Sequence, residues 1–167
     1  TIPLNHRIYT NGFLFQEKNR ERKLNIDKIQ NLEIDVVYYQ KIKYGGDITL
    51  ANGQVIPNSA ITFEPEHEKT YAFCSDTVYD EQLIPFIEGV DVLYHESTFL
   101  EKEMHLAEKT KHSTAKQAAT MALKANVKQL VLGHFSTRYE SINIFKEEAE
   151  TIFPNVFLAD DGKEFEF

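Results

Sequence analysis

The chain has 167 residues, the size of one domain, and 42% of them are hydrophobic, which is enough to form a core and argues against disorder. Its 18 basic and 26 acidic residues give a net charge of −8, which argues against unspecific binding to nucleic acid. The sequence contains no run of about 18 apolar residues, so we expect no membrane span. The single cysteine, Cys74, excludes an internal disulfide framework, and residues 1–13 do not form a signal peptide, so we expect a cytoplasmic protein.

The first 70 residues mix short apolar segments with polar ones. Residues 1–15 are rich in Ile, Leu, Tyr and Phe, which predicts strand, and the Asn-Gly pair at 11–12 is a candidate turn. Residues 17–28 carry five basic and three acidic side chains, which indicates either a solvated surface or a contact with a polyanion. The Asn-Gly pair at 52–53 lies between two alternating segments and predicts a β-hairpin.

From residue 70 onward, short apolar runs alternate with helical segments. The runs YAFCS, DVLY, QLVLG and NVFLA predict strands, and helices are expected at about 114–125 and 141–152. Thr114 and Gln117 fit a capping box at the start of the first of these helices, and Ser141 can cap the second. The alternation predicts a layered α/β arrangement, and we expect one partial domain over residues 1–167.

Each of the four apolar runs leads into a residue that can bind a metal or transfer a proton. These residues are, in chain order, Asp76, His95 with Glu96, His134, and Asp160 with Asp161. Because the carboxyl ends of parallel strands share one edge of a sheet, we expect these side chains to lie along that edge. His and Asp together suit Zn²⁺ or Mn²⁺. For each residue taken singly, the alternative is a turn former or a hydrogen-bonded structural residue.

Other histidines and the cysteine lie in different contexts. His6 lies in a strand-like segment and can point toward the same edge, and His112 comes just before a helix N-terminus, where backbone N–H groups favour an anion. His67 and His105 lie in polar segments, where we expect them to be exposed. Cys74 lies inside a predicted strand and is expected to be a buried small residue rather than a nucleophile.

Six segments, in order along nearly the whole chain, carry a resemblance to a known family: PLNHRIYTNGF (3–13), FCSDT (73–77), LYHESTF (93–99), KHSTAKQAA (111–119), LGHFSTRY (132–139) and FPNVFLADDG (153–162). They resemble ribonuclease Z, an endonuclease of the metallo-β-lactamase superfamily that removes 3′ trailers from precursor tRNA. The resemblance implies the C-terminal half of a metallo-β-lactamase αββα sandwich. Since the family's H-x-H-x-D-H zinc motif is missing, we expect a chain that starts in mid-domain and is inactive alone.

The resemblance implies a site for two zinc ions, with Mn²⁺ as the alternative. His6, Asp76 and His134 match metal ligands, and Asp76 matches the one that bridges both ions. His112 matches a histidine that protonates the leaving oxygen, and Glu96 matches an acidic residue that orients it. We expect weak or absent zinc in the isolated chain, which supplies part of the ligand set.

Two further residues are expected on the substrate side of this site. Arg138 and Ser113 are candidates for substrate binding, since a guanidinium forks onto phosphate oxygens, and a structural ion pair is the alternative for Arg138. The family's tRNA-clamping arm falls at about residues 15–65, where the Gly-Pro step common in relatives is missing. The resemblance therefore implies a shortened or altered arm.

The partners and the alternatives follow from these expectations. The resemblance implies precursor tRNA as substrate, and an apolar sheet face left open in a half fold should favour a homodimer. One alternative is a phosphodiesterase of the same fold that acts on small substrates. The other is a non-catalytic half that acts as a scaffold or pairs with a separate N-terminal chain.

Overall fold

The computed structural model describes residues 1–166, which separate into two compact units. The larger unit contains Thr1–Glu17 and the chain from Lys69 onward, and the smaller unit is Lys18–Glu68. Each unit has its own buried core, so each is described by itself.

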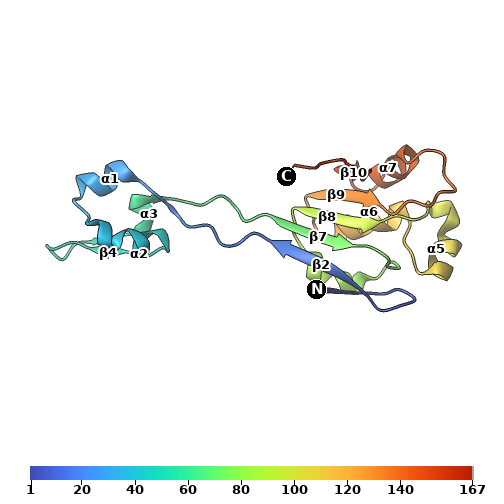
Figure 1. Ribbon diagram of the computed structural model, residues 1–167, viewed down its shortest axis with the longest axis horizontal. Helices are drawn as coiled ribbons and strands as arrows, with labels where there is room; N and C mark the ends of the chain where they lie inside the picture. The colour runs from blue at the N-terminus through green and yellow to red at the C-terminus, as the bar shows by residue number, and fades with distance from the viewer. Residues whose placement is uncertain (167) are drawn as a thin grey trace. The chain divides into compact units, whose positions relative to one another are not determined.

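One mixed sheet organises the larger unit (Figure 1). Its strand order is β1 (Ile2–Leu4), β2 (Thr10–Gln16), β7 (Thr70–Cys74), β8 (Val92–Glu96), β9 (Gln129–Gly133) and β10 (Val156–Leu158). The last four strands run parallel to one another, while β1 pairs with β2 and β2 with β7 in antiparallel fashion. The carboxyl ends of β7, β8 and β9 therefore lie at one edge, and the expected α/β class is confirmed.

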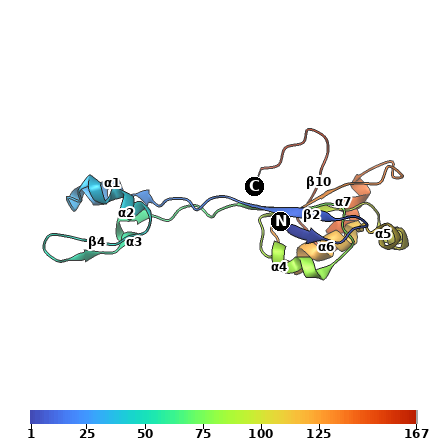
Figure 2. The same ribbon diagram turned by 60° about the horizontal axis from the view of Figure 1, so that its bottom comes forward.

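Helices pack against one face of this sheet. Figure 2 shows α4 (Ile84–Ile87) and α6 (Ala115–Lys124) on the same side, and α7 (Asn143–Glu150) packs on α6 and β10. The predicted capping box starts α6, where the Thr114 hydroxyl accepts from the Gln117 amide at 3.1 Å and the Gln117 side chain accepts from the Thr114 amide at 3.0 Å. Ser141 does not take the predicted N-cap position of α7, which is Ile142 without a side-chain cap, although the Ser141 hydroxyl accepts from the Asn143 amide at 3.3 Å. The remaining helix, α5 (Met104–Thr110), lies between β8 and α6 in the chain.

The opposite face of the sheet carries aromatic side chains. Because side chains alternate along a strand, Ala72 and Leu93 are buried under the helices while their neighbours point the other way. These neighbours, here called the aromatic face, are Phe13, Phe15, Tyr71, Phe73, Tyr94 and Phe157. Rings stack across strands, with centroid distances of 5.8 Å for Phe15–Tyr71 and 4.6 Å for Phe73–Tyr94.

The Asn-Gly pair at 11–12 is not a turn, contrary to the sequence expectation. Both residues lie inside β2, where Gly12 pairs with Ile2 and Asn11 with Pro3. A Cβ atom at Gly12 would lie 2.5 Å from the Phe73 carbonyl oxygen, so glycine is needed here for close approach of strand β7. The turn between β1 and β2 falls instead in residues 5–9.

The smaller unit builds its core mainly from isoleucines. Its elements are β3 (Lys23–Leu24), α1 (Ile26–Asn31), α2 (Tyr39–Lys43), β4 (Ile48–Thr49), β5 (Val55–Ile56), α3 (Asn58–Ile61) and β6 (Thr62–Phe63). The predicted hairpin is confirmed, since β4 and β5 pair antiparallel and Gly53 takes a φ of +84° in the turn. Two side chains of the basic stretch form ion pairs, Arg20 with Glu66 at 2.5 Å and Arg22 with Glu64 at 2.6 Å. These pairs neutralise part of the charge that could attract a polyanion.

Within the described chain, no helix is long and apolar enough to cross a membrane.

We expect Asp91 to stabilise the larger unit at neutral pH. Its carboxylate accepts from the Thr70 amide at 2.7 Å, the Thr70 hydroxyl at 2.8 Å and the Lys128 ammonium at 2.5 Å, which joins the starts of β7, β8 and β9. Burial alone would raise the pKa of Asp91, but these donors lower it from 3.8 to about 2. Asp91→Asn should therefore lower the free energy of unfolding by about 2 kcal/mol at pH 7.

The pH dependence gives this prediction its sign. Because the pKa of Asp91 is lower in the folded chain than in the unfolded chain, its carboxylate stabilises the fold at pH values above the unfolded-state pKa. This stabilisation is lost as the pH falls from about 4 toward 2. Urea unfolding at several pH values should show the two proteins converging over this range. A difference that stays constant down to pH 2 would contradict the assignment.

Candidate functional site

Four side chains from separate segments meet at the carboxyl edge of the sheet. Asp76 follows β7, Glu96 ends β8, His112 precedes α6 and His134 follows β9. Each offers one ligand atom, and these atoms lie within 4.8 Å of one another. The distance from His134 Nε2 to Asp76 Oδ1 is 3.2 Å. The sheet topology thus brings together residues that lie up to 58 positions apart, as 134 − 76 = 58.

The backbone is strained where two of these residues leave their strands. Asp76 and His134 both have a φ of +59°, in the left-handed region that residues with a Cβ rarely adopt. Lys111, next to His112, has a φ of +58°. Such strain persists only where the surroundings hold it, and it is concentrated at functional sites.

The Glu96 carboxylate is fully buried and accepts five hydrogen bonds from four residues. Its Oε1 accepts from the Thr77 amide and from His112 Nδ1, both at 2.7 Å. Its Oε2 accepts from the Thr98 hydroxyl at 2.6 Å, the Thr98 amide at 3.4 Å and the Ser113 amide at 3.1 Å. Burial alone would raise the pKa of Glu96, but the donors, His112 foremost, outweigh burial and lower it. Glu96 is therefore a carboxylate despite its burial.

His112 is held between Glu96 and two other imidazoles. Its hydrogen bond to Glu96 raises the pKa of His112, against the opposing effect of burial. Its ring stacks on His134 at a centroid distance of 5.1 Å and lies 4.9 Å from the ring of His6. Because Nδ1 bonds Glu96, Nε2 is the atom that His112 has left for a ligand or substrate.

His6 lies beside this group and comes from the far end of the chain. Its Nδ1 donates to the Lys111 carbonyl at 2.8 Å, and the Lys111 ammonium donates to the Asn5 side chain at 3.1 Å. The left-handed turn at Lys111 therefore places both His112 and His6. His6 is half-buried and is not one of the four residues whose ligand atoms lie within 4.8 Å.

Two residues expected along this edge are not part of the cluster. His95 is fully buried in β8 and donates from Nδ1 to the Glu96 carbonyl at 2.8 Å, while burial lowers its pKa and keeps it neutral. Its Nε2 has no hydrogen-bond partner among the described residues. Asp160 is exposed, and its carboxylate accepts from the Asp161 amide in the turn that follows β10. Cys74 is buried, which raises its pKa to about 12 and fits the expected structural role.

The two substrate-side candidates differ in exposure. Arg138 is exposed, donates from Nε to the Ser136 hydroxyl at 3.2 Å and stacks over the Phe99 ring at 5.0 Å. Ser113 is fully buried, and its hydroxyl donates to the Thr77 carbonyl at 2.8 Å. Ser113 therefore fixes Thr77, which in turn bonds Glu96, and Ser113 itself is not accessible to a substrate.

Three residues that support the site were not predicted from the sequence. Thr77 and Thr98 bond Glu96 directly, but a threonine carries no chemical signal of its own, and the one pointer is that both lie in the segments FCSDT and LYHESTF that carry the family resemblance. The third is Tyr139, whose hydroxyl donates to Glu103 at 2.6 Å and accepts from the Leu100 amide at 3.1 Å. Tyr139 thereby ties the loop after β9 to the loop after β8.

The residues present fit a metal ion of the zinc or manganese type. The group offers imidazole nitrogens and carboxylate oxygens, the donors that these ions take in proteins. The Asp76 and His134 side chains are 43% and 42% exposed, so an ion can reach them, whereas Glu96 is wholly enclosed. Glu96 therefore belongs to the support of the site.

Comparisons with known proteins give a consistent result. No protein-family model matches the chain. Curated relatives named ribonuclease Z are 46% identical over 162 residues in Parabacteroides distasonis and 44% identical over 166 residues in Cytophaga hutchinsonii. These matches cover 97% and 99% of this chain but 53% of each relative, so the chain spans about half the length of the relatives it matches.

Solved structures show the same relationship at the level of the fold. A metallo-β-lactamase-fold protein from Bacillus subtilis aligns with 57% of this chain and 39% of its own, with a TM-score of 0.54 and 26% identity. A long-form RNase Z from yeast aligns with 60% of this chain and 14% of its own, with a TM-score of 0.51 and 25% identity.

The sheet, its helices and the cluster at the strand ends define part of a metallo-β-lactamase fold with a metal-type site. Within that class, the chain is a partial homologue of ribonuclease Z.

We expect the strain at Asp76 to appear as a preference for glycine over alanine. Both Asp76→Gly and Asp76→Ala remove the carboxylate, but alanine keeps a Cβ at a φ of +59°. The alanine variant should therefore be less stable by about 1 kcal/mol in urea unfolding. The neighbouring Ser75, whose φ is not positive, is the matched control. At this position the alanine variant should be more stable than the glycine variant. The same order at both positions would contradict strain at Asp76.

Proposed function

We propose that the polypeptide containing this chain is a metal-dependent endoribonuclease that hydrolyses the phosphodiester at the 3′ end of precursor tRNA. The cluster of Asp76, Glu96, His112 and His134 carries the proposal. It lies in a chain of which 97% aligns with a ribonuclease Z at 46% identity. The lone buried Cys74 is in keeping with a cytoplasmic location.

Asp76 and His134 are the proposed ligands in the cluster, and His6 is the proposed ligand of a second ion. Zn²⁺ is the proposed metal, with Mn²⁺ as the alternative, and when bound it supplies a Lewis acid that polarises a phosphoryl oxygen and activates water. The 167-residue chain should bind zinc weakly, because three side chains fall short of two complete coordination shells.

His112 is the proposed proton donor. Glu96 holds its Nδ1 at 2.7 Å and so fixes the plane of the ring, which leaves Nε2 to give a proton to the 3′ oxygen that departs. The products would be a tRNA with a 3′ hydroxyl and a trailer with a 5′ phosphate. Glu96 acts through His112 and is a positioning residue in this scheme.

Arg138 is the proposed phosphate contact. Its guanidinium is exposed, and its contacts with Phe99 and Ser136 steady it without neutralising its charge. Ser113, in contrast, is proposed to act through Glu96, to which its backbone amide donates.

Cleavage of a 3′-extended precursor tRNA by the full-length polypeptide tests the function. We expect a metal-dependent cut at the 3′ end of the acceptor stem that a chelator abolishes. His134→Ala should lower the rate by at least about 100-fold, because changes to residues behind the ligands alone cost about 10–100-fold. His105→Ala is the matched control, since this exposed histidine lies on α5, outside the cluster, and its loss should leave the rate unchanged.

Two outcomes would overturn the proposal in different directions. A folded, metal-loaded protein that hydrolyses a small phosphodiester but leaves precursor tRNA intact would favour the small-substrate phosphodiesterase. A folded protein that cleaves neither would favour the scaffold, or a half that pairs with a separate N-terminal chain. Elemental analysis of the 167-residue chain tests the metal proposal, which two tightly held zinc ions per chain would contradict.

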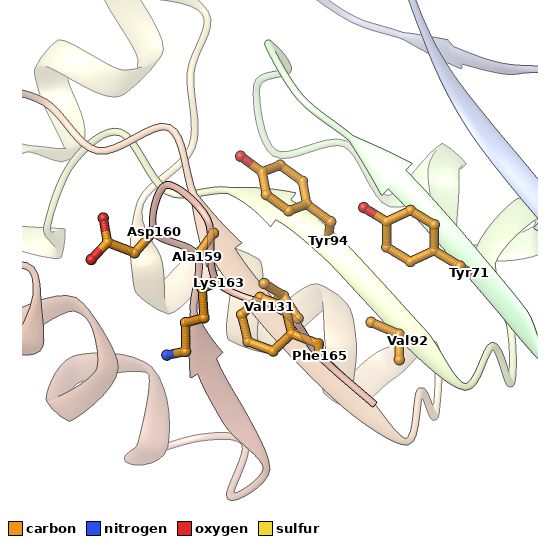
Figure 3. Close-up of a pocket in the computed structure, with 8 residues that line it drawn as sticks. All are labelled: Tyr71, Val92, Tyr94, Val131, Ala159, Asp160, Lys163 and Phe165. Carbon is orange, nitrogen blue, oxygen red and sulfur yellow. The ribbon is translucent and has the colours of Figure 1, made fainter. Parts of the chain in front are cut away.

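We also propose that the 167-residue chain forms a homodimer through the aromatic face. Phe13 and Phe15 are 46% and 56% exposed, and a cavity of about 330 Å³ opens beside Tyr71 and Tyr94 on the same face (Figure 3). Apolar surface of this kind favours association.

Light scattering at high protein concentration tests the dimer. Phe15→Glu should shift the chain toward monomer. Phe86→Glu is the control, because Phe86 is 44% exposed but lies on α4 rather than on the aromatic face. A wild-type chain that stays monomeric would refute the dimer.

A further inference from the structure

Thr98 joins the buried carboxylate to a proposed metal ligand. Its hydroxyl oxygen lies 2.6 Å from Glu96 Oε2 and 2.8 Å from His134 Nδ1. The residue is 7% exposed, and its carbonyl accepts from the Ser136 amide at 3.2 Å. The loop that carries His134 is therefore fixed to Thr98 by both backbone and side chain.

The direction of these hydrogen bonds follows from the number of protons available. A carboxylate can only accept, and Glu96 already accepts from the Thr77 and Ser113 amides, which can only donate. The one hydroxyl proton of Thr98 therefore goes to Glu96. What remains at the Thr98 oxygen is a lone pair, so His134 must supply the proton from Nδ1.

We propose that Thr98 is the positioning residue that sets the tautomer of His134, with the proton on Nδ1 and the lone pair of Nε2 directed at the metal. The inference rests on the proposed function in that it takes His134 for a metal ligand. The Nε2 lone pair is then on the side of the ring that faces Asp76, whose Oδ1 lies 3.2 Å from Nε2. A histidine ligand needs this arrangement, in which the ring nitrogen away from the metal donates its proton.

Glu96 thus orients both histidines of the cluster. It binds His112 Nδ1 directly and His134 Nδ1 through the Thr98 hydroxyl. Both rings consequently turn Nε2 away from Glu96. One buried charge fixes the donor atoms on two segments that lie 22 residues apart, as 134 − 112 = 22.

Two substitutions separate the hydroxyl from the rest of the side chain. Thr98→Val keeps the branched shape and removes the hydroxyl, while Thr98→Ser keeps the hydroxyl. Nitrogen NMR of the metal-free 167-residue chain, labelled at histidine and held where imidazoles are neutral, reports which ring nitrogen of His134 carries the proton. The His134 signals are identified by their loss in His134→Asn.

We expect the proton on Nδ1 in the wild-type chain and in Thr98→Ser, and a shift toward Nε2 in Thr98→Val. In calorimetric titration of the full-length polypeptide with Zn²⁺, Thr98→Val should bind about 10–100-fold more weakly than the wild type, and Thr98→Ser should retain the wild-type affinity. The Phe86→Glu variant, on α4 and outside both the cluster and the aromatic face, serves as a control for effects of substitution far from the site.

The outcomes bear on the two proposals separately. A wild-type His134 with its proton on Nε2, or a Thr98→Val variant with unchanged tautomer, would overturn the role of Thr98. The wild-type measurement decides this even if Thr98→Val fails to fold. A changed tautomer with unchanged zinc affinity would overturn the link to the metal. If the proposed nuclease activity were refuted, the tautomer result would still hold, because the NMR measurement uses neither RNA nor metal.

Discussion

The candidate site depends on one buried carboxylate. Glu96 is fully enclosed, and an ionised carboxylate in that position is stable only when hydrogen bonds replace the water it has lost. Its five donor groups come from the loop after β7, the loop after β8 and the segment before α6. Removing any donor would leave part of the charge uncompensated, so each of these loops has one favourable conformation. The carboxylate thereby fixes the geometry of the residues around it.

This constraint accounts for the strain at the strand ends. Asp76 lies next to Thr77, whose amide is bound to Glu96, and His134 is held through Thr98. A left-handed residue with a Cβ costs about 1–2 kcal/mol, and a hydrogen bond to a charged group contributes about as much. The free energy contributed by the hydrogen bonds of Glu96 is therefore large enough to maintain both unfavourable backbone conformations. The result places the exposed carboxylate of Asp76 beside the exposed imidazole of His134.

The sequence predicted the elements well and the site in part, for physical reasons that differ by residue. Alternation of apolar runs and a capping box are local signals, so the strands from β7 to β10 and the start of α6 could be read directly. The rule that parallel strands share an edge brought Asp76 and His134 together correctly. The rule failed for His95 because successive side chains of a strand point to opposite faces of the sheet, so His95 and Glu96 point in opposite directions.

Other features could not be predicted because they depend on distant contacts. The Asn-Gly pair at 11–12 looks like a turn, but Gly12 is required by the approach of β7, about 60 residues later. Thr98 is two residues from Glu96 in sequence, yet its bond to His134 spans 36 residues and exists only once β8 and β9 have paired. Local patterns identify candidates for chemistry, while the residues that orient them emerge from the sheet.

The site also divides by exposure into two layers with different requirements. Asp76 and His134 must be open to a ligand, so water weakens the interaction between their side chains and little stability comes from it. Glu96, Thr98 and Ser113 are enclosed, where hydrogen bonds are stronger and unmade ones are costly. The outer residues therefore need the inner ones to hold their positions, whereas the inner network is complete without any ion. Such a site can keep its shape before a metal arrives, which lowers the conformational entropy lost on binding.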